Sequence, residues 1–314
     1  MLRGLLLTGL TGLALLACLT CAQICKAQDG RFPPQSQRKV RETLIHQLSA
    51  EGFDPALIRS LLDDERWELS LIVLEKNLIY RESKASYAHF LDAYSTSLAR
   101  DFLEEHRVIL EETEREYGVA KEIIVAILLV ESSLGRHVDR YPVFNTLCSL
   151  SQSSHPEIFP LAFQYLRESY PEVTEDYLRD RAASKSRWAF SELKAFLEIG
   201  IRENLEILEV RGSWAGAFGL PQFVPTSYLT YAVDGDGDNQ VHLHDRHDAM
   251  ASVANYLKAH GWKPGLREKE MMKILFRYNR SRLYGETILG CANKLKDHQA
   301  PSKRSSLKAI GHKG

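Results

Sequence analysis

Cysteine is scarce in this 314-residue sequence, and its placement excludes a small fold held together by disulfide bonds. Of the five cysteines, Cys18, Cys21 and Cys25 lie near the N-terminus, before the part of the chain that has the pattern of a folded domain. Only Cys148 and Cys291 remain, which is too few for a disulfide framework. The sequence leaves open whether these two form a disulfide or stay as buried free thiols, because it does not give their separation.

The sequence also lacks an excess of either charge. Its 40 Lys and Arg residues nearly balance its 41 Asp and Glu residues, for a net charge of −1. No nucleic-acid partner is therefore expected, since such a partner calls for a basic surface. The composition, 44% hydrophobic and 26% charged, is that of a soluble globular protein. Only the tail over 296–314 is basic, and its Ser, Lys and Gly content predicts disorder.

Alternation of polar and apolar residues with the period of a β-strand is almost absent, whereas apolar residues recur at helical spacing from residue 38 onward. Asp54-Pro55 has the form of a helix start, a capping residue followed by proline. One long amphipathic helix is predicted over 92–116 and another over 183–208, with a looser stretch over 141–160. Length alone suggests about two domains. The pattern predicts a mainly α fold over 38–295 with at most a short pair of strands.

A long apolar run near the N-terminus predicts export. Gly4 to Leu16 follows the positive Arg3 and has about the length of the apolar region of a secretory signal. We therefore predict a signal peptide over 1–27, a linker over 28–37 that contains Pro33-Pro34, and a periplasmic location.

Two cleavage sites compete in that signal. Leu15-Leu16-Ala17-Cys18 resembles a lipoprotein signal, in which Cys18 carries the lipid and ties the protein to the outer membrane. Ala22 and Ala27 instead offer the small residues that ordinary signal peptidase requires. An uncleaved anchor is the third alternative.

The second long apolar run ends in a carboxylate. Ile123 to Val130 carries no polar stripe, so it predicts a core helix, and it is too short to span a bilayer. Glu131 follows at the end of the run, and Gly135 is a helix-stop signal. Burial raises the pKa of a carboxyl group, which suits a general acid. The alternative is that the helix simply reaches solvent at Glu131.

An acidic loop has the pattern of the first half of an EF-hand calcium site. Asp234, Asp236 and Asp238 stand at positions 1, 3 and 5, and Gln240 at position 7, where a backbone carbonyl usually binds. Asn239 replaces the usual Gly at position 6. Position 12 is Asp245 rather than Glu, so Asp248, at position 15, is the alternative closing ligand. His242, His244 and His247 fit no familiar zinc spacing, and an empty acidic turn is the other alternative.

A glycine-aromatic loop, Gly212 to Pro225, is not a phosphate cradle, because it lacks the Lys and the glycine spacing of a P-loop. Glycines allow a ligand close approach to the backbone. Aromatic rings beside a neutral amide, here Gln222, are a usual lining for a sugar site. A tight structural corner with core aromatics explains the same residues.

Four motifs in order resemble those of the family of lytic murein transglycosylase B, a group of lysozyme-like glycoside hydrolases. They are Val130 to Arg136, Gly216 to Tyr228, the acidic loop and Ser252 to Trp262. Tyr278-Asn279-Arg280-Ser281 followed by Tyr284 resembles a final tyrosine motif of the family. The resemblance covers about 104–295, except for an extra segment over 153–185, and it is weak in the N-terminal third.

This resemblance implies a lysozyme-like, mainly α fold in which Glu131 is the single catalytic acid. It also implies a glycan groove and a structural calcium loop closed by Asp248, with no organic cofactor. The implied groove residues are Gln222, Phe223, Tyr256, Tyr278 and Tyr284, and the implied metal ligands are Asp234, Asp236, Asp238, Gln240 and Asp248.

The implied activity is non-hydrolytic cleavage of the MurNAc–GlcNAc β-1,4 bond of peptidoglycan, leaving 1,6-anhydroMurNAc ends. A muramidase that hydrolyses the same bond is one alternative, although it requires a second carboxylate. A non-catalytic peptidoglycan-binding protein is the other. We expect a monomer whose partner is the glycan strand.

Overall fold

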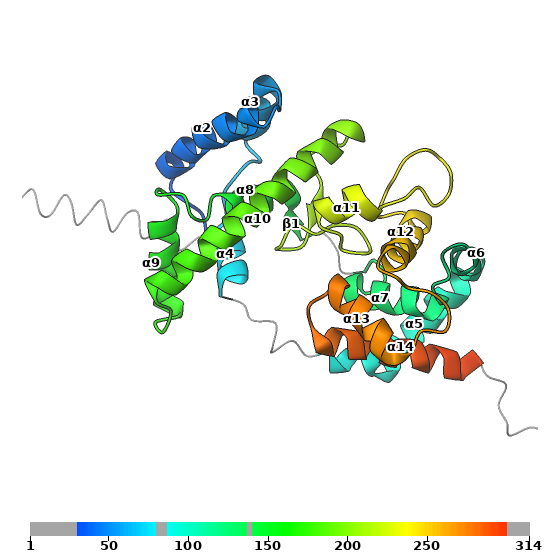
Figure 1. Ribbon diagram of the computed structural model, residues 1–314. Coiled ribbons are helices and arrows are strands. Elements are labelled where there is room, and N and C mark those ends of the chain that lie inside the picture. The colour runs from blue at the N-terminus through cyan, green and yellow to red at the C-terminus, as the bar shows by residue number, and fades with distance from the viewer. Residues whose placement is uncertain (1–29, 80–86, 137–139, 300–314) are drawn as a thin grey trace, which may run out of the picture. The chain divides into compact units, whose positions relative to one another are not determined.

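The computed structural model describes residues 30–79, 87–136 and 140–299, and they form two compact units (Figure 1). Of the described residues, the first comprises 30–79, 140–218 and 224–226, and the second comprises 87–136, 219–223 and 227–299. The predicted signal peptide, Cys18 and the basic tail beyond Gln299 lie outside the described residues. Within the described ranges, no helix has both the length and the apolar character of a membrane span.

The first unit is helical around a long helix, α10 (Glu175–Arg202), which packs on α8 (Val143–Ser151) and α4 (Leu71–Leu78). Its other helices are α2 (Pro34–Ala50), α3 (Pro55–Asp63) and α9 (Phe159–Ser169). The predicted start of α3 is confirmed, because the Asp54 side chain accepts a hydrogen bond from the Ala56 amide and Pro55 follows it.

A pair of two-residue strands also belongs to the first unit. β1 (Tyr141–Pro142) pairs antiparallel with β2 (Arg211–Gly212). Gly212 allows the Ala217 carbonyl to lie against the end of β2, because a Cβ atom there would lie 2.2 Å from that oxygen. The expectation of a mainly α protein with a short strand pair is thus confirmed for the described residues.

The second unit surrounds α7 (Lys121–Ser132), which contacts four other helices of that unit (Figure 1). These are α5 (Ala93–Glu105), α6 (Arg107–Tyr117), α12 (Arg246–Ala259) and α14 (Arg282–Gln299). The short η2 (Ala88–Leu91) and α13 (Glu268–Tyr278) complete it, and α11 (Pro225–Tyr231) starts among residues assigned to the first unit. Ile123 to Leu129 are each at most 2% exposed, so the predicted core helix is confirmed.

The structure corrects the predicted boundaries of four segments. α2 begins at Pro34, inside the linker predicted over 28–37. The helix predicted over 92–116 is broken at His106, whose ring packs edge-on to Phe102 with the centroids 4.4 Å apart. The looser stretch predicted over 141–160 contains α8, because every residue of that short helix is buried and no amphipathic period is visible. α10 begins at Glu175, where Thr174 accepts a hydrogen bond from the Tyr177 amide, rather than at 183.

Both cysteines in the described part of the chain are buried free thiols. Burial raises the pKa of Cys148 to about 12 and that of Cys291 to about 11. Because the thiolate is the reactive form, both thiols should resist iodoacetamide at pH 8 in the folded protein and react once it is unfolded. Peptide mapping by mass spectrometry measures this for each cysteine, and rapid alkylation of either one without denaturant would contradict the burial described.

Candidate active site and calcium loop

Glu131 lies in the last turn of α7, and a tightly bonded turn follows it. The helix ends at Ser132, before the predicted stop at Gly135. Ser133, Leu134 and Gly135 have φ values of 51°, 61° and 86°, so two non-glycine residues adopt left-handed backbone. The Ser132 hydroxyl donates to the Leu128 carbonyl at 3.1 Å and accepts from the Gly135 amide at 3.1 Å. These bonds hold the strained turn and thereby the half-buried Glu131.

The charge of the Glu131 carboxylate affects the pKa of two tyrosines, the half-buried Tyr278 and the buried Tyr284. Burial raises the pKa of both Tyr278 and Tyr284 well above the usual value, and the negative charge of Glu131 raises them further. Glu131 also acts on the Tyr284 side chain through a hydrogen-bonding interaction, which raises the pKa of the tyrosine further. Glu131 therefore lies close to two neutral phenols, of which Tyr278 donates its hydrogen to the Pro221 carbonyl and Tyr284 can donate to an anion.

Aromatic rings predicted to line a groove form one cluster around Tyr278. Its ring centroid lies 4.8 Å from that of Tyr256, 6.0 Å from that of Phe223 and 6.2 Å from that of Tyr284. Tyr256, Phe223 and Tyr284 are 7%, 2% and 1% exposed, whereas Tyr278 and Gln222 are half-buried. The structure thus brings the predicted rings together, but three of them are buried, and among the predicted groove residues only Tyr278 and Gln222 retain partly exposed surface.

Gln222 is held in a strained conformation on the glycine-aromatic loop. Its φ is 51°, and its backbone amide and side-chain amide both donate to the Gly219 carbonyl, at 3.1 and 2.9 Å. The Leu220 amide donates to the Leu243 carbonyl at 2.8 Å, and the Tyr278 hydroxyl donates to the Pro221 carbonyl at 2.7 Å. Such strain persists only where the surroundings over-determine it, which is typical of ligand-binding residues.

The Tyr278 hydroxyl offers a test of this support. Tyr278→Phe keeps the ring but removes the bond to Pro221, so we expect it to lower kcat/KM of the reaction that the sequence resemblance implies about tenfold by freeing the loop. Tyr228→Phe is the control, because it removes a 2.7 Å bond of the same kind to the Val241 carbonyl. Steady-state assays and thermal melts of both variants give the comparison, and equal kcat/KM for the two would refute the special role of Tyr278.

Three carboxylates of the acidic loop gather as a cation site would require. Oxygen atoms of Asp234, Asp236 and Asp248 lie within 4.8 Å of one another. Asp248 is 2% exposed and accepts hydrogen bonds from the Gly235 amide at 2.7 Å and the His242 amide at 2.6 Å. Burial raises the pKa of Asp248, and the negative charges of the nearby Asp236 and Asp245 raise it further. The two hydrogen bonds act in the opposite direction. This donor set fits a hard cation such as calcium.

The backbone of the loop has the conformation that such a site needs. Asn239, in the position usually held by Gly, has a φ of 68°, and its amide donates to Asp234 at 2.8 Å. Burial tends to raise the pKa of Asp234, but backbone hydrogen bonds from Asn239 and Gly237 outweigh it and lower the pKa. A Cβ atom at Gly235 would lie 2.5 Å from the His247 carbonyl oxygen, so glycine is required where the loop approaches α12.

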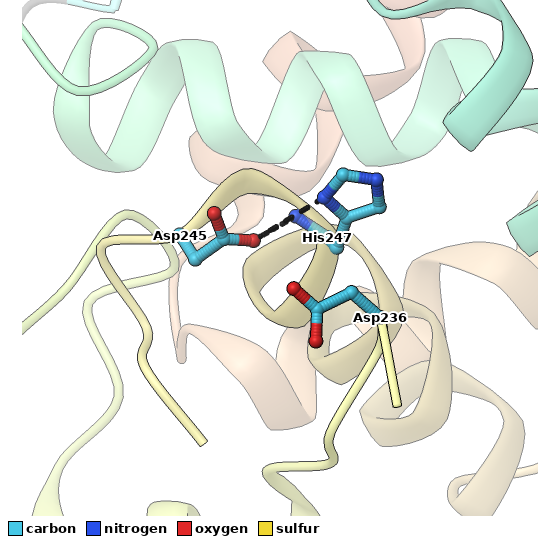
Figure 2. A group of neighbouring side chains, drawn as sticks. All are labelled: Asp236, Asp245 and His247. Atoms are coloured by element: carbon cyan, nitrogen blue, oxygen red, sulfur yellow. Dashed lines mark hydrogen bonds and ion pairs between the residues drawn. The ribbon is translucent and has the colours of Figure 1, made fainter. Parts of the chain in front are cut away.

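Asp245 caps a helix, although its position in the EF-hand motif is that of a metal ligand. It caps α12 by accepting a hydrogen bond from the His247 amide at 2.7 Å, and the His247 ring lies beside it (Figure 2). Asp236, Asp245 and His247 form a second group of possible ligands, which shares Asp236 with the first. Asp238 accepts from the Gln240 amide at 2.7 Å and joins neither group.

Sequence reasoning missed Glu192, a carboxylate that is 3% exposed within α10. The signal was present, because Ala189, Leu193 and Phe196 follow the helical period on the same side of the segment. Sequence reasoning also missed Tyr87, whose ring packs edge-on to that of Tyr284 with the centroids 6.3 Å apart.

Residues 35–271 match the family described as the transglycosylase SLT domain, and this is more than half of the chain. The chain is also similar, at 38% identity over 149 residues, to the membrane-bound lytic murein transglycosylase B of Escherichia coli K12. That stretch is 48% of this chain but only 34% of the relative, so the match spans about a third of the relative's length.

Solved structures with the same fold confirm the predicted fold class. The soluble lytic transglycosylase SltB1 of Pseudomonas aeruginosa superposes with a TM-score of 0.66 at 24% identity, over 84% of this chain and all of that one. Escherichia coli Slt35 in complex with calcium gives 0.63 at 21% identity, over 85% and 94% of the two chains. SltB3 of Pseudomonas aeruginosa with NAG-NAM-pentapeptide gives 0.66 at 22% identity, over 83% and 80%.

Proposed function

The chain belongs to the transglycosylase SLT domain family, and on this basis we propose that it cleaves the MurNAc–GlcNAc β-1,4 bond of peptidoglycan without consuming water. The products would carry 1,6-anhydroMurNAc ends. The proposal rests on the family membership together with the geometry around Glu131, the residue to which we assign the chemistry.

In the proposed mechanism Glu131 acts first as an acid and then as a base. The protonated carboxyl donates its proton to the glycosidic oxygen, the C1–O bond breaks, and the GlcNAc hydroxyl leaves. The MurNAc acetamido group or the electrostatics of the site stabilise the positive charge that develops at C1. The Glu131 carboxylate then removes the proton from the MurNAc 6-hydroxyl, whose oxygen bonds to C1 and closes the anhydro ring. Glu131 is thereby reprotonated.

One observation favours this single-residue chemistry over hydrolysis. Among the described residues, Glu131 is the carboxylate whose charge raises the pKa of Tyr278 and of Tyr284. Retaining and inverting glycosidases place two carboxylates about the scissile bond. In the second unit, Asp234, Asp236 and Asp248 gather in an arrangement that suits a cation, and we assign them to the metal rather than to catalysis.

We assign glycan binding to the aromatic cluster and the adjoining loop. Gln222 and Tyr278, which retain partly exposed surface, would contact the sugar directly. Phe223, Tyr256 and Tyr284 would fix their positions from below. The structure of SltB3 with NAG-NAM-pentapeptide shows that a protein of this fold binds such a ligand.

Calcium is the proposed structural cofactor. Asp234, Asp236 and Asp248 would supply carboxylate oxygens, and Asp238 and Gln240 remain predicted ligands from the motif. A bound cation would neutralise these charges and tie the loop to α12, the helix that carries Tyr256. It would take no part in bond cleavage. The calcium complex of Slt35 is a precedent in a protein of the same fold.

We also propose a periplasmic location, with export directed by the apolar segment that follows Arg3. A lipid on Cys18 would hold the protein at the outer membrane, where peptidoglycan strands are its partner. Edman sequencing of the mature protein, or mass spectrometry of its N-terminal peptide, distinguishes an acylated Cys18 from cleavage at Ala22 or Ala27.

Mass spectrometry of digested peptidoglycan tests the proposed activity. Anhydro ends are lighter than reducing ends by one water, so they distinguish a transglycosylase from a muramidase. Binding to intact sacculi with no soluble product would instead support a peptidoglycan-binding protein without catalytic activity.

A further inference from the structure

Leu220 contacts both the acidic loop and the turn that follows Glu131. Its amide donates a hydrogen bond to the Leu243 carbonyl at 2.8 Å. Its side chain is 6% exposed and lies against Gly135, because a Cβ atom built on this glycine would lie 3.5 Å from the Leu220 Cγ atom. All of these residues belong to the second unit. Leu220 therefore joins two loops that are distant in the sequence.

The Leu243 carbonyl belongs to a segment that a proposed cation ligand holds in place. The amide of His242, the residue before Leu243, donates to the Asp248 carboxylate at 2.6 Å. The Asp245 amide donates to the His242 carbonyl at 2.7 Å, so the backbone over 242–245 forms a tight turn around Leu243, which is 2% exposed. A cation that fixes Asp248 would thereby fix the acceptor of the Leu220 bond.

Gly219 allows the two loops to touch without a side chain between them. A Cβ atom there would lie 2.3 Å from the Leu243 Cβ atom and 2.9 Å from the Leu243 carbonyl oxygen, and the φ of Gly219 is 74°. Any larger residue would have to separate the loops. Because close-packed interiors transmit displacement, a shift of Leu243 reaches Gly219 directly.

Gln222 depends on Gly219 in turn. Its backbone amide and its side-chain amide both donate to the Gly219 carbonyl, at 3.1 and 2.9 Å, and its φ of 51° is left-handed. A strained backbone of this kind is kept only by its surroundings. The position of Gly219 therefore affects where the amide group of Gln222 is held.

We propose that Gly219 and Leu220 are positioning residues, which couple the cation site to Gln222 and to the turn after Glu131. Calcium binding would thus order the glycan site as well as the acidic loop. The coupling rests on the proposed calcium site, and its consequence for catalysis rests on the proposed activity. Neither positioning residue touches a reacting atom in this account.

Hydrogen exchange of the wild-type protein, measured by mass spectrometry with calcium and with EDTA, tests the coupling without any substrate. Opening of the bond between Leu220 and Leu243 disturbs the cation site, so a bound cation opposes that opening. At a free calcium concentration about 100 times its Kd, exchange over 132–136 and 219–223 should slow by as much as about 100-fold. Peptides over 261–267, in the connection between α12 and α13, report general stabilisation of the same unit.

Gly219→Ala should uncouple the two loops without changing a cation ligand. Its melting temperature should still rise with calcium, but exchange over 219–223 should no longer depend on calcium. Gly265→Ala is the matched control, because the φ of Gly265 is 80° and a Cβ atom there would meet no atom within 4 Å. It therefore introduces similar backbone strain without the contact to Leu243, and it should keep the calcium-dependent slowing.

Kinetics on glycan strands test the consequence for catalysis. Calcium should raise kcat/KM about tenfold in the wild type and in Gly265→Ala, the effect expected for one hydrogen bond that is held in place. In Gly219→Ala, kcat/KM should be the same with calcium and with EDTA.

The outcomes separate this coupling from the proposed activity. Exchange over 219–223 that calcium leaves unchanged, or slows no more than exchange over 261–267, would overturn the coupling, and this comparison needs only the wild type. Calcium-dependent slowing that persists in Gly219→Ala would overturn it as well. A wild-type protein that releases no anhydro product would overturn the proposed activity, and the exchange data would still decide whether the loops are coupled.

Discussion

Replacing Glu131 with glutamine is expected to abolish release of anhydro products while the protein stays folded. Glutamine keeps the size of the side chain but can neither donate the acid proton nor take up the proton of the 6-hydroxyl. General acid–base catalysis contributes up to about 10⁴-fold for one positioned group, and here a single residue serves both steps. We therefore expect a loss of at least about that size in kcat, measured by quantifying anhydro muropeptides.

Glu122 provides the matched control for this substitution. It lies in the first turn of the same helix, α7, and is 5% exposed. Glu122→Gln should leave kcat unchanged, because this position is not in the aromatic cluster. Thermal melts establish that both variants are folded. Substantial activity in folded Glu131→Gln protein would eliminate Glu131 as the acid.

Calcium is expected to raise the melting temperature, and a chelator to lower it. The carboxylates of Asp234, Asp236 and Asp248 lie within 4.8 Å of one another and repel one another unless a cation is present. A ligand that binds only the folded state adds about 2.7 kcal/mol of stability when its free concentration is 100 times its Kd. Calorimetry with added calcium and with EDTA measures the shift.

Two substitutions show which aspartate closes the calcium site. Asp248→Asn should remove most of the calcium response, because Asp248 is the buried member of the group. Asp245→Asn should weaken the cap of α12 but retain the response to calcium. A melting temperature that neither calcium nor EDTA changes would contradict the assignment of calcium to this loop. A calcium response that is abolished only in Asp245→Asn would show that Asp245, and not Asp248, closes the site.

Local signals in the sequence were sufficient for several elements of the fold. Asp54-Pro55 predicts the start of α3 because a cap and a proline act within one turn. The apolar run that ends at Glu131 predicts a core helix because its uninterrupted composition leaves no polar side to expose. The alternating aspartates likewise predict a folded acidic loop, in which Asn239 has the expected left-handed backbone.

Features that depend on contacts between distant residues were not predictable in this way. His106 ends α5 although the apolar pattern continues into α6. The left-handed φ of Gln222 accompanies its own bonds to Gly219 and also bonds that neighbouring loop residues make to Leu243 and Tyr278, which are distant in the sequence. The Glu192–Thr226 pair joins residues 34 positions apart, so only the three-dimensional structure relates them.

The exposure of the predicted site residues also depends on contacts between distant residues, so the sequence did not give it. Motif resemblance implies that Phe223, Tyr256 and Tyr284 line a groove, and the structure adds that all three are buried in the packed unit. Burial is a property of the packed unit, and the spacing of residues in a motif does not contain it. The assignment of all these residues to glycan binding stays a prediction.

Digestion of peptidoglycan in water enriched in heavy oxygen tests the central claim most directly. Mass spectrometry of the released fragments should find anhydro ends without heavy oxygen, because the MurNAc 6-hydroxyl, and not water, attacks C1. Reducing ends that carry heavy oxygen from the solvent would show hydrolysis and contradict the account of Glu131 as acid and then base.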